Sequence, residues 1–117
     1  MSLVYAGVLS HAPGMTGRAE LVENTALRDE FYARLDAQRR DIEASGAEAL
    51  VVIAAEHFAN FFMNNMPAYC IGISDEYEGP IEDPKWLKIE RTKVPGNARL
   101  SRTLVEQVMH SVDVAYA

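Results

Sequence analysis

The sequence predicts an α/β fold, with a largely parallel or mixed central sheet flanked by helices. Two observations support this prediction. Apolar runs of strand length alternate along the chain with segments whose apolar residues recur at helical spacing. One of these runs, residues 49–55, is apolar throughout, which is typical of a strand covered on both faces. We expect residues 1–117 to form a single α/β domain or the N-terminal part of one larger domain.

The first two expected strands are residues 3–9 and residues 49–55. Residues 3–9 are apolar with a β-branched and aromatic bias, and Pro13 and Gly14 prevent a regular continuation after them. Residues 49–55 end in a polar loop that begins at Glu56. Both runs are therefore predicted to be strands with a loop at the carboxyl end.

Further strands are expected towards the C-terminus. Residues 69–73 form a third apolar run, and the acidic stretch from 74 to 84, with its prolines and glycine, indicates an exposed loop. Residues 86–90 are a candidate for one more short strand, and residues 112–117 have strand composition. The sequence stops on that last strand with no loop after it, so the fold is expected to be incomplete at its C-terminus.

Two helices are expected between these strands. The first begins near Thr25, a candidate cap, and ends at Gly46, and its apolar face is formed by Leu27, Phe31, Leu35 and Ile42. The second is capped by Asn97, and its buried stripe is formed by Leu100, Leu104, Val105 and Val108.

Charge and composition exclude several classes of partner. The chain has 17 acidic and 11 basic residues, a formal net charge of −6, and its basic residues are scattered, which argues against nucleic-acid and anionic-membrane surfaces. No apolar stretch approaches the roughly 20 residues needed to span a bilayer. The single cysteine, Cys70, cannot form an internal disulfide, which indicates a reducing, cytoplasmic compartment.

Two of the three histidines are candidate metal ligands. His11 and His57 each follow closely on an expected strand, so parallel neighbouring strands would bring both imidazoles to one edge of the sheet. The alternative is structural: His11 makes a loop hydrogen bond beside Pro13, and His57 caps a strand end. His110 is expected to interact with the dipole at the end of the second helix.

The residues around both histidines resemble class III extradiol ring-cleavage dioxygenases, the group of the protocatechuate 4,5-dioxygenase catalytic subunit and 2,3-dihydroxyphenylpropionate dioxygenase. The stretch Ser10-His11-Ala12-Pro13 resembles the family's first metal-ligand motif. Residues 49–55, then Glu56-His57-Phe58, Phe61-Phe62, Met66-Pro67 and Cys70-Ile71-Gly72, look like its second ligand histidine with the flanking segments. The order, the spacing and the strand before each motif make the combination more specific than either motif alone.

The resemblance implies that His11 and His57 bind a non-haem Fe(II), whose facial triad is completed by a carboxylate. It implies an oxidoreductase of aromatic catabolism that cleaves a catechol with dioxygen. The family's ligand glutamate and acid-base histidine would come after residue 117, so the chain alone is expected to be inactive. Glu56 stands where the family usually has aspartate, which leaves the contact made by that aspartate in question.

Three aromatic side chains near His57, namely Phe58, Phe61 and Phe62, suit the walls of a pocket for a flat aromatic substrate, although each is equally suited to an ordinary core. The alternative function is a non-catalytic α/β binding module or subunit that keeps the fold. The sequence does not identify the catechol or the third metal ligand. A half-built crevice would expose apolar surface, which a second copy or a partner subunit could cover.

Overall fold

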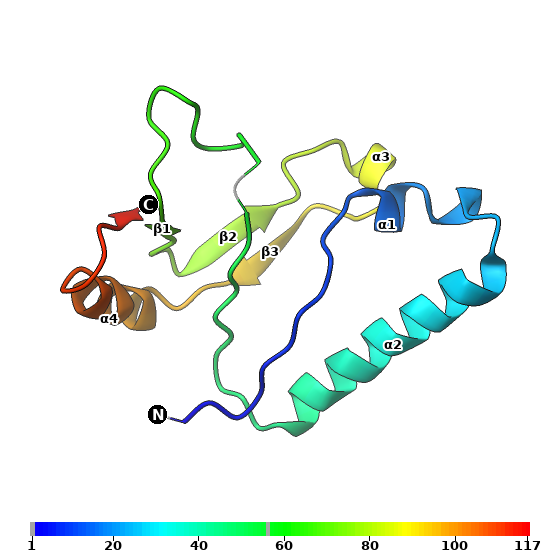
Figure 1. Cartoon of the computed structure of the whole chain (residues 1–117), viewed down its shortest axis with the longest axis horizontal. Helices are drawn as coiled ribbons and strands as arrows, with labels where there is room; N and C mark the ends of the chain where they lie inside the picture. The colour runs from blue at the N-terminus through cyan, green and yellow to red at the C-terminus, as the bar shows by residue number, and fades with distance from the viewer. Residues whose placement is uncertain (1, 56) are drawn as a thin grey trace. The chain divides into compact units, whose positions relative to one another are not determined.

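The computed structural model describes residues 2–55 and 57–117. The chain divides into two compact units, one formed by the segment up to Val51 with Asp83–Ile89, the other by Val52–Glu82 with Glu90–Ala117. Figure 1 labels the helices and strands in chain order.

The first unit is dominated by α2 (Thr25–Ala44), which confirms the first expected helix. Asn24, and not Thr25, caps it, because the Asn24 side chain accepts a hydrogen bond from the Leu27 N–H at 3.0 Å. Gly46 follows the helix with a φ of +70°, the left-handed conformation that glycine adopts most easily. Exposed ion pairs one turn apart, Arg34 with Glu30 and Arg39 with Glu43, add modest support on the water-facing side.

Three short turns complete the first unit: α1 (Gly14–Gly17), the 3-10 turn Ala19–Leu21, and α3 (Pro84–Leu87). The helix α3 shows that a strand at 86–90 was wrong. Asp83 accepts a hydrogen bond from the Lys85 N–H at 2.9 Å and Pro84 occupies the first helical position, a combination that begins a helix. Leu87 is buried, and α1 packs against α3.

The second unit contains an antiparallel pair, β2 (Glu76–Gly79) and β3 (Thr92–Pro95), which lie side by side in Figure 1. The expectation of an irregular loop over 74–84 was therefore wrong for β2. The acidic residues of β2 form ion pairs with basic residues in β3 or directly before it. Glu76 contacts Lys93 at 2.8 Å, and Glu78 lies 4.0 Å from Arg91. A short strand with two acidic residues and a glycine has the composition of a loop, and only its pairing with β3 identifies it as a strand.

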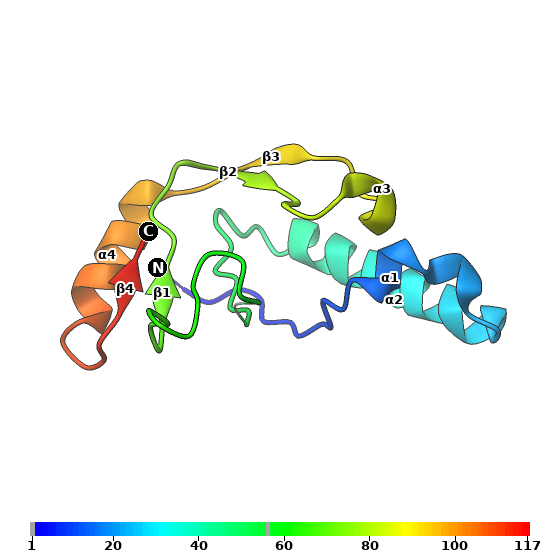
Figure 2. The same ribbon diagram turned by 90° about the horizontal axis from the view of Figure 1, so that it is seen from above.

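A parallel pair, β1 (Cys70–Ile71) and β4 (Ala115–Tyr116), confirms strands within residues 69–73 and 112–117. Between them in sequence lies α4 (Ala98–Val108), capped by Asn97, whose side chain accepts from the Leu100 N–H at 3.0 Å. Figure 2 shows α4 alongside β1 and β4. Val105 is buried and the rest of the predicted stripe is half-buried, so this helix and its cap are confirmed.

The first two expected strands are not formed in the described part of the chain. Residues 3–9 and 49–55 carry no strand assignment, and their side chains are largely exposed, as for Val8 (96%) and Ile53 (93%). A strand exists only with a hydrogen-bonded neighbour, and apolar composition does not supply one. Helices together with parallel and antiparallel strand pairs nevertheless confirm the α/β class with mixed pairing, arranged as two separate two-stranded sheets. Among the helices described, none has both the length and the apolar character needed to cross a bilayer.

Candidate functional site

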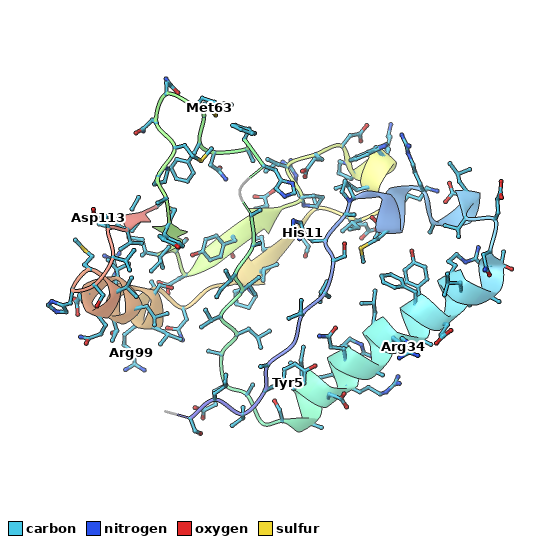
Figure 3. The ribbon with its side chains drawn as sticks, viewed as in Figure 1. Tyr5, His11, Arg34, Met63, Arg99 and Asp113 are labelled. Carbon is cyan, nitrogen blue, oxygen red and sulfur yellow. The ribbon has the colours of Figure 1, made fainter. Side chains whose placement is uncertain are left out.

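His11 stands at the end of the extended N-terminal segment, just before the chain turns into α1 (Figure 3). The turn after it is held by the Met15 N–H donating to the Ala12 carbonyl at 3.0 Å. Pro13, at the N-cap of α1, lacks an N–H and has a φ of −64°, which suits a helix start. The local sequence therefore sets the backbone conformation directly after His11, whose imidazole is exposed to water.

His57 is also exposed, and it is followed by a residue in a costly conformation. Phe58 has a φ of 58°, the left-handed region that bulky side chains rarely adopt and that costs on the order of 1 to 3 kcal/mol. The chain direction therefore changes directly after the histidine. Glu56, which precedes it, lies outside the described residues.

The three phenylalanines after His57 differ in exposure. Phe58 is 53% exposed and Phe62 is 59% exposed, whereas Phe61 is half-buried. A turn follows, in which the Asn65 N–H donates to the Phe62 carbonyl at 2.8 Å. Aromatic surface that is half open to water can contact a flat ring, and the role of these side chains as pocket walls stays a prediction.

The two histidines belong to different units, His11 to the first and His57 to the second. A common site for them therefore stays a prediction. Among the described residues, no group of three or more His, Cys, Asp or Glu side chains is placed to hold a metal ion. Two exposed imidazoles have the donor chemistry that suits iron, and they fit two positions of a facial triad but not the carboxylate position.

The remaining chemically distinctive groups lie elsewhere. Desolvation raises the pKa of the Cys70 thiol in β1, which favours the protonated thiol over the thiolate. His110 lies directly after the C-cap residue of α4, Met109, which is the position expected for it. Its interaction with the helix dipole stays a prediction.

An apolar hollow in the first unit was not predicted from the sequence. It lies between α1 and α2 and is lined by Met15, Leu27, Phe31 and Tyr32, with the Arg28 side chain beside them. Tyr32 donates a hydrogen bond to the Met15 carbonyl and so fixes one wall of the hollow. Leu27 and Phe31 belong to the predicted apolar face of this helix, and they are 61% and 36% exposed. The amphipathic pattern identified this face without showing what covers it.

Curated relatives of the chain are named as dioxygenases. One from Pseudomonas putida, named 2,3-dihydroxyphenylpropionate/2,3-dihydroxicinnamic acid 1,2-dioxygenase 2, is 35% identical over 75 residues, which cover 64% of this chain and 23% of the relative. Dioxygenases of the same name without the final numeral, from Cupriavidus necator and Cupriavidus pinatubonensis, are each 37% identical over 84 residues, which cover 70% of this chain and 25% of the relative.

The chain thus spans about a quarter of the length of the relatives it matches. No protein-family model matches it. No solved structure matches it either. The likeness to ring-cleavage dioxygenases supports, over the aligned part of the chain, the extradiol family indicated by the histidine motifs.

Proposed function

We propose that this chain supplies two histidine ligands, His11 and His57, to the Fe(II) site of an extradiol ring-cleavage dioxygenase. The observation that carries the proposal is the 35 to 37% identity to dioxygenases over 64 to 70% of the chain. The names of these relatives agree with the family that the two histidine motifs resemble.

The placement of the two histidines in the sequence adds support. Each stands two residues after a seven-residue apolar segment, His11 after residues 3–9 and His57 after residues 49–55. In a parallel sheet, equal spacing of this kind brings side chains to the same edge. Both segments are extended and without strand partners in the described part of the chain, so their backbones have the form that such pairing requires.

The chemistry of the donors fits the proposed metal. Neutral imidazoles suit iron, and two of them with one carboxylate occupy a single face of the ion. Fe(II) held on one face would supply open positions for the catechol and dioxygen. The protein's own contribution at this point is to hold two neutral nitrogens and to offer Phe58, Phe61 and Phe62 as apolar walls against a flat ring.

The proposed substrate is a catechol that carries a short acidic side chain. The relatives are named for 2,3-dihydroxyphenylpropionate and 2,3-dihydroxycinnamic acid, both of which belong to this chemical class. Dioxygen is the proposed second substrate. We place the reaction in a cytoplasmic enzyme, because a reduced metal and a free cysteine suit a reducing compartment.

A second candidate function is a non-catalytic binding module. It is favoured by the absence, among residues 2–55 and 57–117, of any group of three side chains placed to hold a metal. The two functions differ in one measurable property, which is the uptake of Fe(II) through both histidines.

The test is an anaerobic titration of the chain with Fe(II), followed by calorimetry. Saturable binding of one ion is expected, and both His11→Ala and His57→Ala should abolish it, because one imidazole alone holds Fe(II) too weakly. His110→Ala is the matched control and should bind like the unaltered chain. Equal binding by all four proteins would refute the proposed ligands and favour the binding module.

A further inference from the structure

The turn that follows His11 is too short to be stable by itself. α1 has four residues, whereas isolated helices are marginal in water below about 12 residues. Its hydrogen bonds reach back towards the histidine. The Met15 N–H donates to the Ala12 carbonyl at 3.0 Å, and the N–H of residue 17 donates to the Pro13 carbonyl at 3.1 Å. A movement of α1 is therefore passed to the backbone that carries the His11 imidazole.

Two contacts within the first unit hold α1. It packs against α3, where Leu87 is buried. The second contact comes from α2, because the Tyr32 hydroxyl donates a hydrogen bond to the Met15 carbonyl. Carbonyl groups in the last turn of a helix have no partner within that helix, so Tyr32 satisfies a group that would otherwise depend on water. All of these residues belong to the first unit.

Tyr32 is the better anchored partner in this hydrogen bond. It belongs to the 20-residue helix α2, whose start is capped by Asn24. Its ring is half-buried and meets the edge of the Phe31 ring, with the ring centres 5.4 Å apart. A long helix with a capped end thus holds a four-residue turn through one hydroxyl group.

We propose that Tyr32 is a positioning residue for His11. The hydroxyl of Tyr32 holds α1 and so restricts the positions that the His11 imidazole can take. The inference rests on the proposed function, in which His11 is a ligand of Fe(II). A ligand held in place before the metal arrives loses less conformational freedom on binding, and this raises the affinity for the metal. Tyr32 acts only through the backbone of α1 and has no contact with the metal in this account.

Nitrogen-15 relaxation of the metal-free chain tests the positioning itself. Tyr32→Phe keeps the ring and removes only the hydroxyl. The order parameters of residues 14–17 and of the His11 side chain should fall from about 0.85, which is typical of rigid groups, towards about 0.6. Tyr5→Phe is the matched control, because it removes a hydroxyl from the first unit away from α1 (Figure 3). Unchanged order in Tyr32→Phe would overturn the inference, and so would an equal decrease in Tyr5→Phe.

Anaerobic calorimetry with Fe(II) tests the consequence for metal binding. Tyr32→Phe should weaken Fe(II) binding about 2- to 10-fold, which corresponds to the loss of one hydrogen bond, and Tyr5→Phe should not weaken it. Asn24→Ala removes a different hydrogen bond of α2, so it should lower stability and leave Fe(II) affinity unchanged. An equal loss of affinity in Tyr32→Phe and Asn24→Ala would mean that the effect is one of stability, and the positioning role would be wrong.

The failure of this inference differs from the failure of the proposed function. If His11→Ala abolishes Fe(II) binding while Tyr32→Phe keeps full affinity, the ligand assignment stands and the positioning role is refuted. If His11→Ala binds Fe(II) as tightly as the unaltered chain, the proposed function is refuted, and the role of Tyr32 in metal binding is refuted with it.

Discussion

Gly17 lies against the backbone carbonyl of Trp86, so that a Cβ built on the glycine would stand 2.5 Å from that oxygen. No side chain at position 17 fits without movement of backbone on one side or the other. This contact joins α1 to α3, two turns that are distant in sequence, just beyond the His11 motif.

Gly17→Ala is therefore expected to destabilise the first unit by about 1 to 3 kcal/mol, the usual cost of forcing an extra carbon into a packed contact. Trp86 is the only tryptophan, so urea unfolding followed by its fluorescence reports this contact directly. Gly14→Ala is the matched control, because nothing lies within 4 Å of a Cβ at that position. If both variants unfold at the same urea concentration, the close packing of Gly17 on Trp86 is wrong.

The cap of α2 provides a second prediction. Asn24→Ala removes the side-chain acceptor for the Leu27 N–H and should cost about 1 kcal/mol. Thr25→Ala should change stability much less, since Thr25 is already the first helical residue. The helical signal at 222 nm during thermal unfolding measures both, and an equal loss from the two substitutions would contradict the cap assignment.

The ion pair between Glu20 and Lys88 predicts a weak dependence on pH. The hydrogen bond from Lys88 holds the pKa of the Glu20 carboxyl below its ordinary value. A carboxyl whose pKa is lower when folded stabilises the protein above its unfolded pKa, and the contribution is lost as the pH falls through the folded pKa. Both side chains are exposed, so the effect will be small.

The comparison is between the unaltered chain and Glu20→Gln, with urea midpoints measured by Trp86 fluorescence from neutral pH down through the carboxyl range. The urea midpoint of Glu20→Gln should fall less on acidification than the midpoint of the unaltered chain. Glu23→Gln serves as the control for removal of one acidic charge near the same turn. Identical acid profiles for all three chains would exclude a role for the pair.

Catalysis is predicted to be absent from the 117-residue chain. At the proposed site, Fe(II) bound by His11 and His57 would lack a carboxylate ligand, because the described residues contain no group of three or more His, Cys, Asp or Glu side chains that could hold a metal ion. After anaerobic loading with Fe(II), addition of catechols and air should give no yellow ring-opened product by absorbance. Sustained turnover would show that a carboxylate of this chain, for which Glu56 is a candidate, or one from a second copy completes the site.

Much of the helical structure could be predicted from the sequence, because its signals are local. The apolar spacing in α4, the Asn97 cap and the glycine after α2 each act within a few residues. The turn at α3 has an equally local signal in Asp83-Pro84, whereas the composition of residues 86–90 favours a strand. The two histidines were found for the same reason, since a motif requires only residue identity and spacing.

Strand pairing was decided by the tertiary structure alone. Residues 49–55 have the composition of a strand and stay unpaired, whereas Glu76–Gly79 look like a loop and form β2 because β3 lies beside them. A helix closes its hydrogen bonds within four residues, but a strand needs a partner that the local sequence does not name. The sequence therefore determined the α/β class, the helices α2 and α4 and the candidate ligands His11 and His57, while only three-dimensional contacts determined which extended segments became strands.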